Sequence, residues 1–235
     1  MQKRSLIIGI LLLLIRVMVA QSTFPRLVAD AFGSDQELIN GIQFSNHFGQ
    51  VDGHPYFLDE RFRNGSINIA DQLYEHMNLR YNLYSQRVEI EYRYGNGHLI
   101  QFMSVPELIP SFSIEGRIFV RMQLGDGAFA YYQVVSSGSS ACYIGWSKDK
   151  NIARNDSFRA YQFSAPKRSY WLRLGQDVTP FNNRKTFAGT FPEQIQKDIL
   201  KMLKQQRFSF KNATVVQAEE MVIAALGIYE MQLLP

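Results

Sequence analysis

Cysteine is almost absent from this 235-residue sequence, in which Cys142 stands alone. A disulfide within the chain is therefore excluded, and so is the class of secreted scaffolds that disulfides hold together. A chain of this length buries roughly 70 % of its unfolded surface in one core, so it does not need such cross-links. Cys142 lies in an apolar stretch without a Cys–His pattern, which is typical of a small buried side chain rather than a nucleophile.

Histidine is also scarce, and the four histidines, His47, His54, His76 and His98, are dispersed along the sequence. Zinc sites usually show short-range pairs such as His-x3-His or Cys-x2-Cys, and none is present. His47, Asp52 and His54 could in principle supply nitrogen and oxygen ligands, but a dispersed set is more typical of surface or core histidines. We expect no metal site and no cofactor.

Signatures of catalysis are weak. The serines of the turn at 137–140 lack the Gly-x-Ser-x-Gly spacing of a nucleophile turn, and no helix is expected after them. Glu89 and Glu91 fall on one face of a strand, flanked by Arg87 and Arg93. That pattern is better explained by cross-strand ion pairs than by two carboxylates converging on a substrate bond. We therefore predict that the protein is not an enzyme.

Long apolar runs are limited to residues 6–15, which follow Lys3 and Arg4 and lead to the small residue Ala20. This arrangement is typical of a secretory signal peptide cleaved after Ala20. The run is shorter than the about 20 residues that span a bilayer. We expect residues 1–20 to be removed and no transmembrane segment to remain. Because secreted eukaryotic domains usually carry disulfides, the expected compartment is a bacterial periplasm.

Charge is nearly balanced but unevenly distributed. The chain carries 25 basic and 21 acidic residues, and loss of the leader reduces the net charge from +4 to +1. Residues 21–147 carry −5, residues 148–211 carry +9, and residues 212–235 add three acids. The basic part could meet an acidic partner or an anionic membrane surface, or it could be a set of solvated helix faces. Nucleic acid is not an expected partner of an exported protein.

Alternation of apolar and polar residues dominates the middle of the chain, most clearly at 79–84 and 88–94. Further strands are expected at 54–58, 66–70, 98–103, 117–124, 128–135, 141–146, 161–163, 168–174 and 176–178. Closely spaced strands with turn signals between them are typical of an antiparallel meander. Pro106 and Pro110 are expected to confine their stretch to a loop or a sheet edge.

After Pro180 the apolar period changes from two residues to about 3.6. Residues 190–193 have the pattern of a capping box at the start of a helix, which carries lysines on its polar side. Residues 214–217 have the same pattern before a second helix. The sequence therefore predicts an α+β fold. It consists of an antiparallel β-meander, as an open sheet or a partial barrel, followed by a C-terminal helical hairpin at about 182–227. Residues 21–235 are expected to form one domain.

Aromatic residues are the one enriched class, with 17 Phe, 12 Tyr and 2 Trp. Tyr and Trp combine an apolar ring with a polar tip and often anchor interfaces. In the pairs Tyr131–Tyr132 and Tyr170–Trp171, strand alternation forces the two rings to opposite faces. Both faces must therefore be covered, by the helices, by the N-terminal segment or by a partner. The residues that we predict to form an interaction surface are Tyr92, Tyr94, Tyr131, Tyr132, Tyr143, Trp146, Tyr170 and Trp171.

Four stretches resemble a group of exported, β-rich proteins of Bacteroidetes: PYFLDERFRNGSINI, LRYNLYSQRVEIEY, AYYQVVSSGSSACYIGW and FPEQIQKDILKMLKQQRFSFKN. The likeness covers residues 54–226 and contains no catalytic motif. It implies an exported β-rich fold and, through the periplasmic plug subunit of the type nine secretion translocon, a role at an outer-membrane complex. The Ser-rich turn and the basic stretch at 148–168 depart from the commoner form of the group, so a shared binding surface is not implied.

These observations predict a non-enzymatic periplasmic protein that docks on a cell-envelope complex in the outer membrane, as a translocon plug or accessory subunit. One alternative is a lipid or small-ligand carrier, in which the sheet curls into a half-barrel around a cavity. Another is an unrecognised hydrolase, in which Glu89, Glu91 or the group of His47, Asp52 and His54 would converge in one cleft.

Overall fold

The computed structural model describes residues 51–69, 72–93, 99–104, 106–153 and 160–233, with the backbone alone for 92–93, 99–103 and 233. These residues all belong to the second of two compact units, which spans 47–235. The predicted signal peptide, the segment that follows it and the predicted turn at 95–97 lie outside the described residues.

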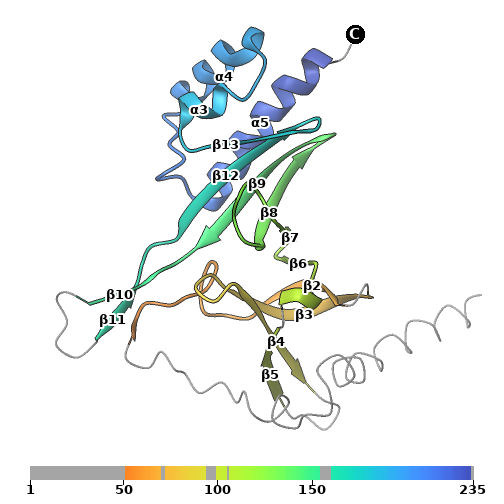
Figure 1. Ribbon diagram of the computed structural model, residues 1–235, viewed down its shortest axis with the longest axis vertical. Coiled ribbons are helices and arrows are strands. Elements are labelled where there is room, and N and C mark those ends of the chain that lie inside the picture. The colour runs from red at the N-terminus through yellow and green to blue at the C-terminus, as the bar shows by residue number, and fades with distance from the viewer. Residues whose placement is uncertain (1–50, 70–71, 94–98, 105, 154–159, 234–235) are drawn as a thin grey trace, which may run out of the picture. The chain divides into compact units, whose positions relative to one another are not determined.

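The main sheet has ten strands and consists of two antiparallel meanders joined edge to edge (Figure 1). The first contains β2 (Arg63–Ile69), β3 (Gln72–Asn82), β4 (Arg87–Arg93) and β5 (Leu99–Met103). The second contains β6 (Ser111–Ile114), β7 (Arg117–Met122), β8 (Ala130–Ser137), β9 (Ser140–Ser147), β12 (Lys167–Leu174) and β13 (Asp177–Phe181). β2 pairs with β6, and the sheet is open at β13 and β5. The predicted α+β fold with an open antiparallel sheet is confirmed.

One strand prediction is wrong and one inner strand was not predicted. β6 lies inside the sheet between β2 and β7 and was missed, whereas Pro106 and Pro110 lie outside the strands, as expected. The prolines occupy only the short 3-10 helix η1 (Pro106–Leu108) and the position just before β6, so they remove no hydrogen bond from the sheet. The predicted strand at 54–58 forms a single bridge, between Tyr56 and Asn82.

A second, three-stranded sheet joins distant parts of the sequence. β1 (Val51–Asp52) runs parallel to β11 (Tyr161–Phe163), which pairs antiparallel with β10 (Lys150–Ile152). The strand predicted at 161–163 is β11, whereas β1 and β10 were not predicted, because strands of two or three residues give little alternation signal.

The main sheet curls between its two meanders. Strands β3 and β8 are four strand spacings apart in the sheet order, about 19 Å if the sheet were flat. The ring centroids of Tyr81 in β3 and Tyr131 in β8 are nevertheless 5.8 Å apart. Phe112 lies between these strands and packs against both tyrosines, and Phe119 packs against Tyr81 and stacks on Phe112. These interlocked rings form the centre of the core.

The helices pack on one face of the second meander, which we call the inner face. They are α3 (Arg184–Ala188), α4 (Glu193–Gln205) and α5 (Val215–Leu233). α5 contacts β8 and β9, and α4 contacts α3 and α5 (Figure 1). The predicted pair of C-terminal helices is confirmed. Among the residues that the structure describes, no helix has both the length and the apolar character needed to cross a bilayer.

Only one of the two predicted capping boxes forms. The Thr214 backbone N–H donates to Gln217 Oε1 at 2.9 Å, and the Gln217 N–H donates to Thr214 Oγ1 at 3.2 Å. The box predicted at 190–193 is wrong, because Pro192 is the N-cap residue of α4 and makes no side-chain cap bond. Thr190 instead donates its hydroxyl to the Phe187 carbonyl at 2.6 Å.

Polar side chains fix α5 to the inner face. Glu219 accepts hydrogen bonds from the Arg117 guanidinium, with Nε at 2.8 Å, and from the amide of Gln133. Gln133 in turn accepts a bond from Trp146 Nε1 at 3.0 Å. Because this chain of contacts satisfies buried polar groups on β7, β8 and β9, it fixes which side of the sheet α5 covers.

Candidate interaction surface

The predicted aromatic residues divide between the two faces of the sheet. Cross-strand pairing places Tyr131 on the inner face and Tyr132 on the opposite face, which we call the outer face. The same alternation separates Tyr170 from Trp171. The inner face receives Tyr131, Trp146 and Tyr170, and the outer face receives Tyr132, Tyr143 and Trp171. The side chain of Tyr92 and all of Tyr94 lie outside the described residues.

The three inner aromatic residues are part of the core. Tyr131 is 1 % exposed, and its hydroxyl donates to the carbonyls of Pro106 and Ile109 at 3.2 and 3.0 Å. The hydroxyl of Tyr170 donates to the Phe210 carbonyl at 3.2 Å. Burial raises the pKa of both phenols, so they remain protonated donors. These side chains hold the loops and helices on the inner face and do not reach the surface.

The three outer aromatic residues lie together. Tyr132 and Tyr143 form a cluster with Ala141, and this cluster is flanked by partly buried apolar side chains: Met122, Leu124, Ala130, Val134 and Trp171. Within the described residues, no hydrogen bond joins the hydroxyls of Tyr132 or Tyr143 to another residue. Both tyrosines are 8 % exposed, so they offer a partner on this face mainly their hydroxyls as hydrogen-bonding groups rather than ring area.

Two glycines create the shape of this cluster. Gly145 is directly opposite Tyr132, and a Cβ at Gly145 would lie 3.0 Å from Tyr132 Cε1 and 2.4 Å from Ser169 Oγ. Gly125 has a φ of +59° and lets the turn after β7 approach Trp171, where a Cβ would lie 2.7 Å from Cη2. Trp171 is therefore packed beneath a turn, and the tyrosines of the cluster are themselves mostly covered, with Tyr132 and Tyr143 each 8 % exposed.

Apolar side chains extend the cluster across the outer face. Ile118 in β7 is 54 % exposed and Val178 in β13 is 39 % exposed. Both lie on the same face as Tyr132, as the strand registers show. We call the whole set the outer patch: Ile118, Val120, Met122, Leu124, Ala130, Tyr132, Val134, Tyr143, Trp171 and Val178. Ile118 and Val178 are its exposed members, and the other residues are partly buried or buried. Apolar side chains that gather on one surface, unlike scattered ones, are typical of interaction sites.

The ionisable residues that a hydrolase would use are engaged in structural contacts. Glu89 is 2 % exposed and lies opposite Arg80, whose Nη2 and Nε donate to Glu89 Oε2 at 2.6 and 2.9 Å. The Arg80 guanidinium also lies over the rings of Tyr56 and Phe62, at 3.9 and 4.3 Å from their centroids. The predicted cross-strand pairing of Glu89 is confirmed, with its partner on β3. We call this group the Arg80 cluster.

Burial raises the pKa of Glu89, while the charge of Arg80 and hydrogen bonds from Arg80 and Asn82 oppose that shift. Glu91 points to a different partner and accepts a bond from Asn78. The ring of His54 accepts a bond from the Tyr56 backbone, and burial lowers its pKa. His47 lies outside the described residues. Among the residues that are described, no group of three His, Cys, Asp or Glu side chains is placed to hold a metal ion.

A groove lies between the β12–β13 hairpin and the segment that leads into α4. Its volume is about 530 Å³, and its apolar lining comes from Leu172, Leu174, Val178, Phe191, Pro192 and Tyr229. Small-molecule sites commonly have volumes of about 300–1,000 Å³, so the groove could accept a small apolar ligand. Sequence reasoning did not identify it, because its lining comes from three elements with no common motif.

Comparison with known proteins finds no matching family model, no similar curated protein and no similar solved structure. The likeness to exported β-rich proteins therefore stays a prediction, and the function is argued from the geometry above.

Proposed function

We propose that this chain is a non-enzymatic, exported protein of the periplasm that docks on a larger protein complex of the cell envelope through its outer patch. The observation that carries the proposal is the group of apolar side chains on β7, β8, β9 and β12, on the face opposite the helices, with Arg173 between this group and Val178 of β13. Its centre holds two tyrosines and a tryptophan. Rings of this kind at the centre of a surface, surrounded by aliphatic side chains, are the usual anchors of protein interfaces.

The test compares two isoleucines of similar exposure. Ile118 in the outer patch is 54 % exposed, and Ile223 on α5 is 49 % exposed. We expect Ile118→Arg to reduce co-purification of the partner from gently solubilised envelopes at least tenfold, equivalent to about 1.4 kcal/mol, because it introduces a charge into an apolar contact. Ile223→Arg should leave co-purification unchanged. A strictly monomeric parent protein, or equal losses in the two variants, would contradict the proposal.

The resemblance to a translocon plug suggests a more specific version. In that version, the docked protein closes or stabilises an outer-membrane complex. Deletion should then make the outer membrane permeable to small molecules whenever the complex is open. Permeability equal to that of the parent strain would reject this version and leave the docking proposal in place.

The groove beside the β12–β13 hairpin favours a second candidate, a carrier of a small apolar ligand. Native mass spectrometry of protein from the producing cell should then show a bound mass. A ligand held in the groove should be lost when Leu174→Lys places a charge there. A chain of unmodified mass in gentle conditions would exclude this candidate.

A further inference from the structure

Besides the outer patch, the helical layer carries a basic surface on which a ligand could bind. Between residues 182 and 212 seven basic side chains are exposed, and we call them the basic surface: Arg184, Lys185, Lys197, Lys201, Lys204, Arg207 and Lys211. The same stretch contains two acids, Glu193 and Asp198, and therefore carries +5. After loss of the leader the entire chain would carry only +1, so this surface concentrates positive charge well above the average of the protein.

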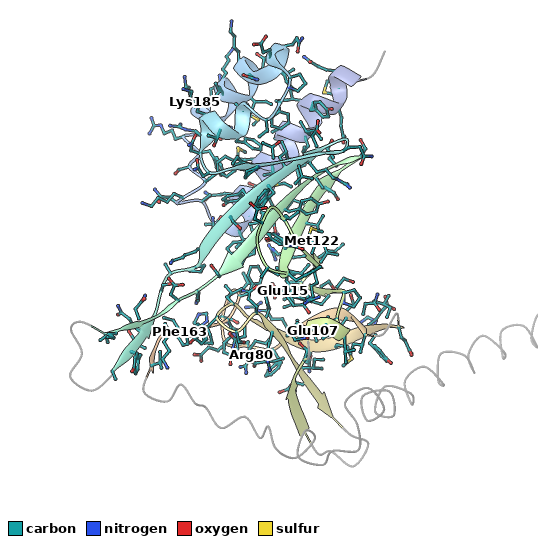
Figure 2. All side chains as sticks on the ribbon, viewed as in Figure 1. Arg80, Glu107, Glu115, Met122, Phe163 and Lys185 are labelled. Atoms are coloured by element: carbon teal, nitrogen blue, oxygen red, sulfur yellow. The ribbon has the colours of Figure 1, made fainter. Side chains whose placement is uncertain are left out.

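Helix α4 separates its buried side from its basic side. Ile195, Ile199 and Leu203 are fully buried, and their spacing of four residues places them on one side of the helix. Lys197, Lys201 and Lys204 fall on the opposite side and are exposed. They extend over about 10 Å at a rise of 1.5 Å per residue. None of these lysines forms an ion pair with another described residue, so their charge is available to a ligand. Figure 2 places Lys185 on the neighbouring α3.

Arg207 adds a basic side chain just beyond the C-terminal end of α4. It follows α4 with a φ of +48°, a left-handed conformation in which helices usually place glycine. Its N–H closes the helix on the Lys204 carbonyl at 3.0 Å, and the next N–H, of Phe208, bonds to Leu203. A non-glycine residue is strained in this conformation, and such strain is often retained at functional positions.

The composition of the surface indicates which anionic partner it fits. Five of the seven basic residues are lysines, and no large apolar side chain is exposed between residues 182 and 212. Specific protein interfaces are depleted in lysine and use aromatic anchors and arginine, because arginine makes directed, two-pronged bonds to carboxylates. An anionic lipid surface attracts lysines through its negative surface potential, and this attraction needs positive charges but no directed hydrogen bonds.

We propose that the basic surface attaches the protein to an anionic phospholipid surface. The contact is peripheral and electrostatic, because no large apolar side chain is exposed there to insert into the bilayer. α4 packs on α5, which covers the inner face, whereas the outer patch lies on the other face of the sheet. Attachment through the helices therefore leaves the outer patch accessible to a protein. The inference does not depend on the proposed function, since different residues carry each.

The test measures co-sedimentation of the full chain with vesicles of phosphatidylcholine mixed with phosphatidylglycerol, and with vesicles of phosphatidylcholine alone. We expect binding only to the anionic vesicles and a steep loss with added salt. The variant K197Q/K201Q/K204Q should bind roughly a hundredfold more weakly, at about a fivefold loss for each basic residue near the membrane. Glutamine has a helix propensity close to that of lysine, so α4 should remain folded, as circular dichroism would verify.

The matched control removes three exposed basic residues elsewhere, in the variant R61Q/R87Q/K167Q. It has the same net charge as the lysine variant, and its vesicle binding should stay within about twofold of the parent, because only charges near the membrane contribute. Equal losses in the two triple variants would overturn the proposal and show an effect of net charge alone. Equal binding of the parent to neutral vesicles would also overturn it.

The single substitution Arg207→Gly distinguishes an effect of lost charge on vesicle binding from an effect of lost stability. Glycine relieves the left-handed strain, so the melting temperature should stay the same or rise, while binding to anionic vesicles should fall about fivefold. A different outcome would reject the lipid. If the lysine variant and R207G both bound vesicles as the parent does, and the lysine variant no longer co-purified with an envelope protein, the partner would be an acidic protein. If Ile118→Arg loses the protein partner but still binds anionic vesicles as the parent does, the result supports both the docking proposal and the lipid proposal.

Discussion

Replacing Arg80 by methionine should destabilise the protein by about 3–5 kcal/mol, the usual cost of leaving one member of a buried ion pair without its partner. Glu89 would remain 2 % exposed and would keep only neutral hydrogen-bond partners, Asn82 Nδ2 at 3.3 Å and the side chain of Tyr56. The stacking of the guanidinium on Tyr56 and Phe62 would also be lost, which weakens the contact of the 54–62 loop with the sheet. Since small domains are stable by about 5–15 kcal/mol, this variant should have a much lower midpoint of urea unfolding.

Two further variants identify the cause. In Arg80→Met/Glu89→Leu no charge remains buried, so most of the lost stability should return. Lys167→Met removes the cation of an exposed pair with Asp149 and should cost less than about 1 kcal/mol. If the double variant were as unstable as Arg80→Met, the stacked rings rather than the ion pair would carry the stability of this region.

The pH dependence of the Arg80→Met effect has a defined sign. Burial raises the pKa of Glu89 above its ordinary value of 4.5, so the folded state holds this proton to higher pH than the unfolded state does. The free energy of unfolding therefore decreases as the pH rises from the unfolded to the folded pKa of Glu89. Loss of Arg80 raises the folded pKa further. The difference in stability between variant and parent should be small below pH 4.5 and largest at neutral pH.

Alternation and composition predicted the sheet well, because most strands have one face in the core. The placement of Tyr131 and Tyr132, and of Tyr170 and Trp171, on opposite faces follows from that alternation alone. The expected cover is observed on the inner face, and its nature on the outer face stays a prediction. Which ring is inward depends on where α5 packs. That position is fixed by contacts such as Glu219 with Arg117, which are 102 residues apart in the sequence, and no local pattern reports them.

The surroundings of Arg80 on β3 show a second feature that could not be predicted from the sequence. Arg80 reads from the sequence as an outward-facing strand residue, yet Tyr56 and Phe62 lie beneath its guanidinium. The bridge of Tyr56 to Asn82 and the bond from Arg80 to the Glu60 carbonyl bring an irregular loop across the strand. Because the loop has no periodicity, its burial is visible only once the fold is known. The basic surface, in contrast, follows directly from the lysine spacing on α4.

Gly65→Ala should be one of the most damaging single substitutions in the chain, at about 3 kcal/mol, the upper part of the range for overpacking. Gly65 lies in β2 between Ile114 of β6 and Met77 of β3. A Cβ at this position would lie 1.9 Å from the backbone oxygen of Ser113 and 3.2 Å from Leu79 Cδ1. A backbone oxygen cannot rotate away as a side chain can, so β2 would have to move from β6. Among the described strands, that pairing is the one that joins the two meanders.

The matched control is the same substitution at Gly227, with the opposite sign. Gly227 lies within α5, and nothing is within 4 Å of the position that its Cβ would occupy. Alanine there should raise the free energy of unfolding by about 1 kcal/mol, because glycine is the less favourable residue in a helix interior. Urea unfolding of the parent and both variants measures the two effects in one series. Equal stability of Gly65→Ala and the parent would mean that β2 and β6 are not held at the observed spacing, and the junction of the two meanders would have to be revised.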